Sequence, residues 1–153
     1  MKSYHIKNKR FVTKVFEDVT EKYDLMNDLM SVGIHRFWKQ EFINWLHPQK
    51  NTKLIDVASG TGDIAKLFLK KVDFKSHVYC VDENYEMLEL NKKKLNMKSN
   101  IKWFCSNAEK LPFKNNYFDY YTISFGIRNI ENISKALEKI DKMKPVHTFL
   151  AWL

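Results

Sequence analysis

Two acidic residues flank a glycine-rich stretch, DVASGTGD, at positions 56–63. Gly60 and Gly62 allow the backbone to approach a ligand closely, and a helix that starts here would offer free N–H donors. Together with Ala65 they also satisfy the loose dinucleotide-binding fingerprint. Any tight strand-to-helix turn favours glycine as well, so the stretch fits both a nucleotide site and an ordinary turn.

Polar residues also follow the next two apolar runs. Asp82 lies about twenty residues beyond the turn, the usual distance for a carboxylate that holds ribose hydroxyls. It also fits the N-cap of a helix starting in ENYEM, a compatible role, but its pairing with the glycine turn favours the ribose. Asn107 and Ala108 would offer an amide and a backbone N–H to the edge of an adenine, although an ordinary polar loop would look the same.

The elements that must position these residues follow from the apolar periodicity. Apolar residues spaced by three and four predict helices, and short β-branched and aromatic runs predict strands. The predicted helices are 12–30, 35–46, 63–71, 85–95 and 133–143, and the predicted strands are 53–58, 77–82, 101–105 and 118–125. This alternation is typical of an α/β domain with a parallel sheet, whose strands present their carboxyl ends, and their ligands, along one edge.

Composition limits the classes of function. With 153 residues and 44% apolar content, the chain can form one domain with a core. No apolar run approaches the roughly 18 residues of a membrane span, and the polar N-terminus predicts no signal peptide. The net charge of +8 comes mostly from scattered lysines, with no basic and aromatic strip for nucleic acid. A solvated surface is the favoured explanation, and contact with an anionic membrane face stays open.

The cysteines and histidines indicate no special chemistry. Cys80 and Cys105 lie in apolar strand-like segments without a CxxC pattern, and both are predicted to be buried, reduced thiols of a cytoplasmic protein. His35 and His47 lack the partners that a metal centre needs, so no metal site is expected.

A longer signature lies nearer the N-terminus. Residues 23–38, YDLMNDLMSVGIHRFW, have the form Y-D-x-M-N-x-x-aliphatic-S-x-x-x-H-x-x-W. This closely resembles the signature of the ubiquinone/menaquinone biosynthesis C-methyltransferases, the UbiE/COQ5 family. The resemblance continues through DVASGTGD, NAEKLPF and FDYYTISFGIRNI and covers roughly residues 12–145. It implies a Rossmann-like class I methyltransferase sheet with N-terminal helices.

The resemblance also implies a cofactor, S-adenosyl-L-methionine (SAM), and roles for individual residues. In this family the glycine turn receives the methionine part of the cofactor. Asp56 is expected to order that turn by accepting backbone N–H bonds. The implied cofactor-binding residues are Thr61 beside Gly60, Asp82 at the ribose, Asn107 and Ala108 at the adenine, and Ser124.

The implied reaction moves a methyl group from SAM to a ring carbon of a polyprenyl-substituted quinol. Arg128, in the segment FGIRN, is the candidate catalytic residue, because it would stabilise a phenolate or polarise a water that takes the proton. Anchoring a loop, or pairing with Glu131, is the alternative. Tyr23, Met26, Asn27, His35 and Trp38 would belong to a lid and substrate pocket. A cytoplasmic location, peripheral contact with the inner face of the membrane and a homodimer are further expectations, and a nucleic-acid partner is not expected.

Three other functions would each explain part of the sequence. A nicotinamide-dependent dehydrogenase would explain the glycine turn and Asp82, but not the segments YDLMNDLMS, NAEKLPF and SFGIRN. A nucleic-acid methyltransferase would explain the charge, but the Asn/Asp-Pro-Pro-Tyr type of tetrapeptide is absent from the sequence. An inactive remnant of a quinol methyltransferase is the third alternative.

The last residues suggest that alternative. Relatives continue after the Lys-Pro with Gly-Gly and further strands, whereas Pro145 is followed here by VHTFLAWL. We therefore expect a helical lid over 1–50, a Rossmann-like core over 51–145 and an aberrant tail over 146–153, with the C-terminal strands missing. An unpaired apolar edge along the fourth strand is the predicted cost. Residues 148–153 offer a makeshift strand for that edge.

Overall fold

The computed structural model describes residues 34–73, 75–95, 100–124, 126–143 and 147–151, the last range and Arg128 as backbone only. The chain separates into two compact units, Met1–Trp38 and Lys39–Leu153, and the sheet belongs to the second. The helix predicted over 12–30, with Tyr23, Met26 and Asn27, lies outside the described residues. None of the helices in the described part of the chain has the length and apolar content that a membrane crossing requires.

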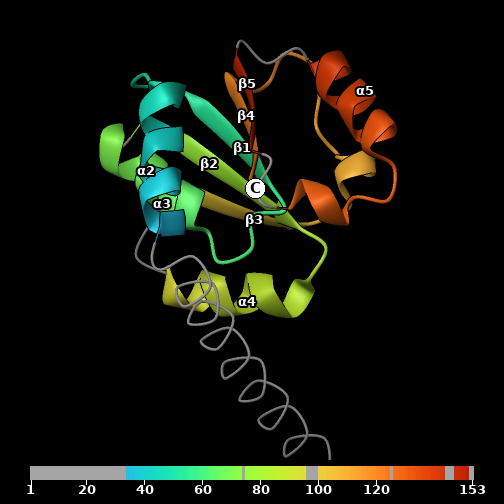
Figure 1. The fold of residues 1–153 in the computed structure, drawn as a ribbon, viewed down its shortest axis with the longest axis horizontal. Coiled ribbons are helices and arrows are strands. Elements are labelled where there is room, and N and C mark those ends of the chain that lie inside the picture. Colours follow the sequence, from blue (N-terminus) through green and yellow to red (C-terminus); the bar gives the residue numbers. More distant parts are fainter. Residues whose placement is uncertain (1–33, 74, 96–99, 125, 144–146, 152–153) are drawn as a thin grey trace, which may run out of the picture. The chain divides into compact units, whose positions relative to one another are not determined.

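Helices and strands alternate along the described chain (Figure 1). The elements are α2 (Ile34–Leu46), β1 (Lys53–Val57), α3 (Asp63–Lys71), β2 (His77–Asp82), α4 (Tyr85–Lys94), β3 (Ile101–Cys105), the 3₁₀ helix η1 (Ala108–Lys110), β4 (Tyr120–Ser124), the 3₁₀ helix η2 (Ile127–Asn129), α5 (Ile133–Met143) and β5 (His147–Ala151). The four predicted strands and the four predicted helices within this part are confirmed, with small shifts at their ends. β4 starts at Tyr120, and just before it the Asp119 carboxylate accepts a hydrogen bond from the Lys53 N–H at 2.8 Å.

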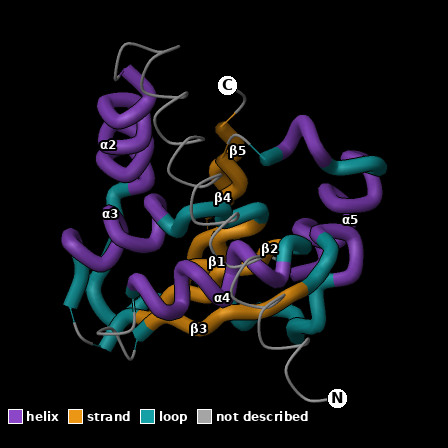
Figure 2. The backbone as a smooth tube through the Cα atoms, turned by 90° about the horizontal axis from the view of Figure 1, so that it is seen from below, coloured by secondary structure: helices purple, strands orange, loops and turns teal. Residues whose placement is uncertain are grey.

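The strands form one parallel sheet in the order β3-β2-β1-β4-β5. Figure 2 shows them as a single layer with β3 and β5 at its two edges. Consecutive side chains of a strand point to opposite faces, so each strand feeds two cores. The predicted α/β class is confirmed, and the crossover connections bring the carboxyl ends of the strands to one edge.

Two apolar clusters hold helices on the two faces of the sheet. On one face, Leu54 and Val78 pack with Ile43 of α2 and Phe68 of α3, all of them inaccessible to solvent. On the other face the cluster joins the sheet to α5 through Ala136, Ile140 and Met143. Buried side chains on both faces explain why the strands have near-continuous apolar runs.

The segment after α5 adds a strand to the sheet. β5 pairs in parallel with β4, with Ala151 opposite Ser124. The predicted unpaired edge along β4 is therefore wrong, because β4 has β1 on one side and β5 on the other. The physical reason is that β4, α5 and β5 form a further strand–helix–strand unit. Such a unit places its second strand parallel to the first and next to it.

The two cysteines differ in their surroundings. Cys80 is buried in β2, and burial raises the pKa of its thiol. Cys105 is exposed, so its predicted burial is wrong. It is the last residue of β3, a strand at the edge of the sheet, and such a position is covered on fewer sides than one in a central strand.

Candidate functional site

The carboxyl ends of β1, β2, β3 and β4 lie together at one edge of the sheet. The register places Val57 opposite both Val81 and Ile123, and Asp82 opposite Cys105. The residues predicted for a cofactor site all follow or end these strands: Thr61 after β1, Asp82 at the end of β2, Asn107 and Ala108 after β3, and Ser124 at the end of β4. The topology thus brings all five to the edge where parallel α/β sheets bind ligands.

The turn between β1 and α3 has an unusual backbone. Gly60 and Gly62 have positive φ angles of 49° and 71°, and Ala58 has one of 52°. A Cβ atom added at Gly60 would meet no atom within 4 Å outside its two chain neighbours, so the space beside this residue is open. The turn therefore combines a left-handed backbone, which favours glycine, with an open surface at the edge of the sheet.

The Asp82 carboxylate holds this turn from the side of β2. Its Oδ2 accepts a hydrogen bond from the Gly60 N–H at 2.9 Å, and its Oδ1 accepts one from the Asn84 N–H at 3.0 Å. The N-cap of α4 is Asn84, whose side chain accepts from the Met87 N–H, so an N-cap role for Asp82 is wrong. Asp82 instead joins the glycine turn to the start of α4.

Asn91 is a site residue that the sequence analysis missed. It lies on α4, is 2% exposed, and donates a short side-chain hydrogen bond to the Gly60 carbonyl. Asn91 follows the buried Leu88 by three residues, so it lies on the apolar side of the helix. A polar residue in such a position needs a buried hydrogen-bond partner, and this pattern could have identified it from the sequence.

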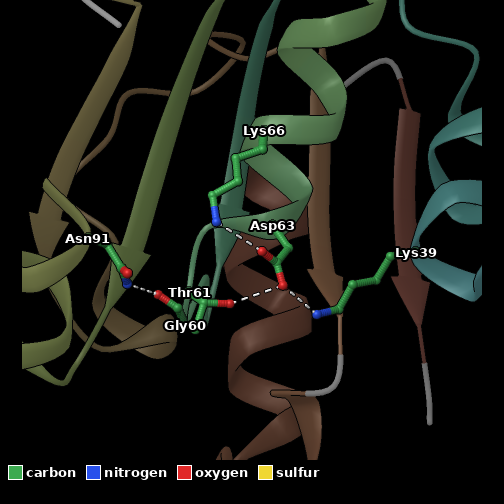
Figure 3. A network of polar contacts seen from close by, with 6 residues as sticks. All are labelled: Lys39, Gly60, Thr61, Asp63, Lys66 and Asn91. Atoms are coloured by element: carbon green, nitrogen blue, oxygen red, sulfur yellow. Dashed lines mark hydrogen bonds and ion pairs between the residues drawn. The ribbon is translucent and has the colours of Figure 1, made fainter. Parts of the chain in front are cut away.

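An ion-pair network holds the other side of the turn, around Asp63 (Figure 3). Asp63 accepts from Lys39 Nζ at 2.7 Å, from the Thr61 hydroxyl at 3.1 Å and from Lys66 Nζ at 3.1 Å. Burial would raise the pKa of Asp63, but the ammonium groups of Lys39 and then Lys66 hold it well below its usual range. The sequence did not point to Lys39, because it lies 24 residues from its partner and on another helix.

The segments after β3 and β4 complete this edge. The Asn107 side chain accepts a hydrogen bond from the Glu109 N–H at 2.6 Å and caps η1, and Ala108 is buried. Ser124 ends β4, and its carbonyl accepts from the Gly126 N–H at 2.6 Å. Arg128 lies in η2, just past that end, and only its backbone is described.

Asp56 lies in β1, just before the turn, and is 1% exposed. Its Oδ1 accepts a hydrogen bond from the Thr122 hydroxyl at 2.8 Å, and its Oδ2 has no partner among the described residues. Among the described residues, no backbone N–H of the turn donates to Asp56, so the expected role in ordering the turn is wrong. Asp56 faces its neighbour Thr122 across the β1–β4 register instead. Burial raises its pKa from 3.8 to about 7.

This shifted pKa predicts how stability changes with pH. Between pH 3.8 and about 7 the folded protein keeps the Asp56 proton that the unfolded chain has lost. The free energy of unfolding therefore falls as the pH rises through this range. Asp56→Asn should therefore be more stable than the unaltered chain at pH 8 by about 1–2 kcal/mol, and within about 0.5 kcal/mol of it at pH 4.5. Urea unfolding at both pH values measures this. Asp141→Asn, at an exposed position, is the control, and an equal difference at both pH values would contradict the prediction.

Comparisons with known proteins agree with this architecture. The model of the ubiE/COQ5 methyltransferase family matches residues 3–150. Ubiquinone/menaquinone biosynthesis C-methyltransferases UbiE are similar to this chain. The Rickettsia prowazekii protein is 48% identical over 153 residues, covering 95% of this chain and 61% of the relative, and the Rickettsia bellii protein is 51% identical over 146 residues, covering 91% and 58%. The chain thus spans about three-fifths of the length of these relatives.

Solved structures are similar in fold. A putative S-adenosyl-L-methionine-dependent methyltransferase from Methanococcus maripaludis has a TM-score of 0.70 at 18% identity, over 86% of this chain and 61% of that one. A SAM-dependent methyltransferase from Aquifex aeolicus has a TM-score of 0.61 at 24% identity, over 67% and 55%. The sheet is therefore the Rossmann-like sheet of class I methyltransferases. The resemblance seen in the sequence is confirmed by the family match, and the chain belongs to the ubiE/COQ5 methyltransferase family.

Proposed function

We propose that this chain binds SAM at the carboxyl edge of the sheet and serves the C-methylation of a polyprenyl-substituted quinol in ubiquinone or menaquinone biosynthesis. The observation that carries the proposal is the Asp82 carboxylate, fixed by the Gly60 and Asn84 N–H groups beside the open side of Gly60. A fixed carboxylate next to a turn without a side chain fits a ligand that carries a ribose. The family and the printed function of the relatives supply the reaction.

The residues of this edge have distinct roles in the proposal. The carboxylate oxygens of Asp82 each hold one backbone N–H and keep further acceptor capacity for ribose hydroxyls. The Gly60–Thr61 backbone lines the methionine part of SAM, and Asn107 and Ala108 contact its adenine. Ser124 binds SAM from the end of β4. When bound, SAM supplies a methyl group on a positively charged sulfur, which is the electrophile.

The protein must then align the ring carbon and remove a proton. Arg128 is the proposed catalytic residue, because it lies in η2, the next element after β4, and a guanidinium stabilises a phenolate through charge-assisted hydrogen bonds. The net charge of +8 supports peripheral contact with an anionic membrane face, where a prenylated substrate would lie. A homodimer is also part of the proposal. The nicotinamide-dependent alternative receives no support from the family match.

Titration of SAM and of NAD into the purified chain tests the proposal. We expect saturable heat or quenching of tryptophan fluorescence with SAM and none with NAD. Thermal unfolding is followed in parallel. A chain that unfolds cooperatively but does not bind SAM would contradict the proposed function. A chain that neither unfolds cooperatively nor binds SAM would be the inactive remnant considered above.

A further inference from the structure

Lys39 is the most enclosed cation of the network around the glycine turn. Its side chain is 17% exposed, whereas that of Lys66, which contacts the other oxygen of Asp63, is 39% exposed. A charge that is removed from water in this way is costly unless its partner is well placed. The 2.7 Å contact with Asp63 Oδ2 provides that partner.

The packing of α2 determines where Lys39 lies. Ile43 and Leu46 follow Lys39 by four and seven residues, so the three share one side of the helix. Both apolar residues are buried in the cluster that also contains Ile64 and Phe68 of α3. The apolar contact between α2 and α3 therefore holds the ammonium group at the start of α3, where Asp63 is the first residue.

The turn would carry excess negative charge without Lys39. Asp56, Asp63 and Asp82 all lie around it, and the charges of Asp82 and Asp63 raise the pKa of Asp56 whereas the charge of Lys39 lowers it. Lys66 offsets part of this negative charge through its contact with Asp63 Oδ1, but its own side chain is more exposed to solvent. Lys39 thus compensates two carboxylates, one directly and one through space.

The same Asp63 oxygen serves both Lys39 and the turn. Asp63 Oδ2 accepts from Lys39 Nζ and from the Thr61 hydroxyl, as Figure 3 shows. On the opposite side, Gly60 is held by Asp82 and Asn91. The turn is therefore fixed from two directions, and the side toward α3 depends on the position of the Asp63 carboxylate.

We propose that Lys39 is a positioning residue for the cofactor site: by holding Asp63, it keeps Thr61 and the Gly60–Gly62 turn in the shape that receives SAM. This inference rests on the proposed function. It makes α2, a helix outside the strand–turn–helix motif, a determinant of cofactor affinity. It also assigns Lys39 an effect through Asp63, not a contact with the cofactor.

The test is SAM affinity measured by calorimetry in a set of variants. Lys39→Met should weaken binding by about tenfold or more, since a charged hydrogen bond that orders the turn is lost. Lys39→Arg keeps the charge and should stay within about threefold of the unaltered chain. Lys70→Met, at an exposed position of α3, is the matched control and should leave affinity unchanged. If the methionine variant does not fold, Lys39→Gln replaces it, because glutamine keeps a hydrogen-bond donor without the charge. Its SAM affinity should then be lower than that of Lys39→Arg.

A double variant distinguishes the proposed route from a direct contact. If Lys39 acts through Asp63, then Lys39→Met combined with Asp63→Asn should bind SAM no more than about threefold more weakly than Asp63→Asn alone. Additive losses, or unchanged affinity in Lys39→Met, would overturn the inference.

Thermal unfolding of the ligand-free variants supplies the remaining control. An affinity loss in Lys39→Met that persists at a temperature at which the unfolding curves show every variant to be folded supports the positioning role, and a loss that vanishes there would overturn it. Failure of the unaltered chain to bind SAM would overturn the proposed function and this inference with it. Normal binding by the unaltered chain with no effect at Lys39 would overturn the inference alone.

Discussion

Gly126→Ala should lower the free energy of unfolding by about 3 kcal/mol. A Cβ atom at residue 126 would lie closer than 3.0 Å to the Ala58 Cβ, with the Ala58 carbonyl oxygen at 3.4 Å and its Cα at 3.5 Å. A methyl group fixed to the backbone cannot rotate away, so relief requires a shift of the backbone. The two segments involved are the glycine turn and the loop that leads to η2. For a chain of this size the loss corresponds to a fall of about 6–12 °C in Tm.

The clash can be tested from its other side. Ala58→Gly removes the methyl group that residue 126 would meet, so the double variant with Gly126→Ala should recover most of the lost stability. Ala58→Gly alone should have little effect, because relief of its left-handed conformation, about 1 kcal/mol, is offset by the greater freedom of glycine in the unfolded chain. Differential scanning calorimetry of the three variants measures this. A Gly126→Ala variant within about 0.5 kcal/mol of the unaltered chain would contradict the prediction.

The close approach of Ala58 and Gly126 illustrates what a sequence does not reveal. Periodicity locates helices and strands because it reports which faces are buried, and the ends of β2 and β3 were predicted to the residue. Parallel topology then brings Asp82, Asn107 and Ser124 to one edge without further information. The contact between residues 58 and 126 depends instead on the positions of two loops that are distant in the chain.

The partners of polar side chains were the least predictable part of the site. Asp56 was expected to serve the turn but bonds to Thr122, and Asp63 is held by a lysine from α2. In each case the residue type indicated a need for a partner, since buried polar groups are hydrogen-bonded. The identity of that partner follows from strand register and helix packing. A local pattern contains neither of these.

Asp82→Ala should weaken SAM binding by at least about 100-fold, the largest effect on affinity that we expect from a single change. The variant removes the acceptor of the Gly60 N–H and of the Asn84 N–H together with the proposed ribose contact. The turn would then be held by the Asn91 side chain on this side and by Asp63 on the other. Calorimetric titration measures the loss, and thermal unfolding shows whether the ligand-free protein remains folded.

Two further variants separate charge from geometry at this position. Glu86→Ala removes an equal charge from the exposed first turn of α4 and should leave SAM affinity nearly unchanged. Asp82→Asn keeps the size of the side chain but replaces one acceptor with an NH₂ group, so only one of the two backbone N–H groups keeps its partner. Its affinity should fall between those of Asp82→Ala and the unaltered chain. If Asp82→Ala binds SAM as well as the unaltered chain, the prediction is contradicted, and the ribose must be held elsewhere along the edge.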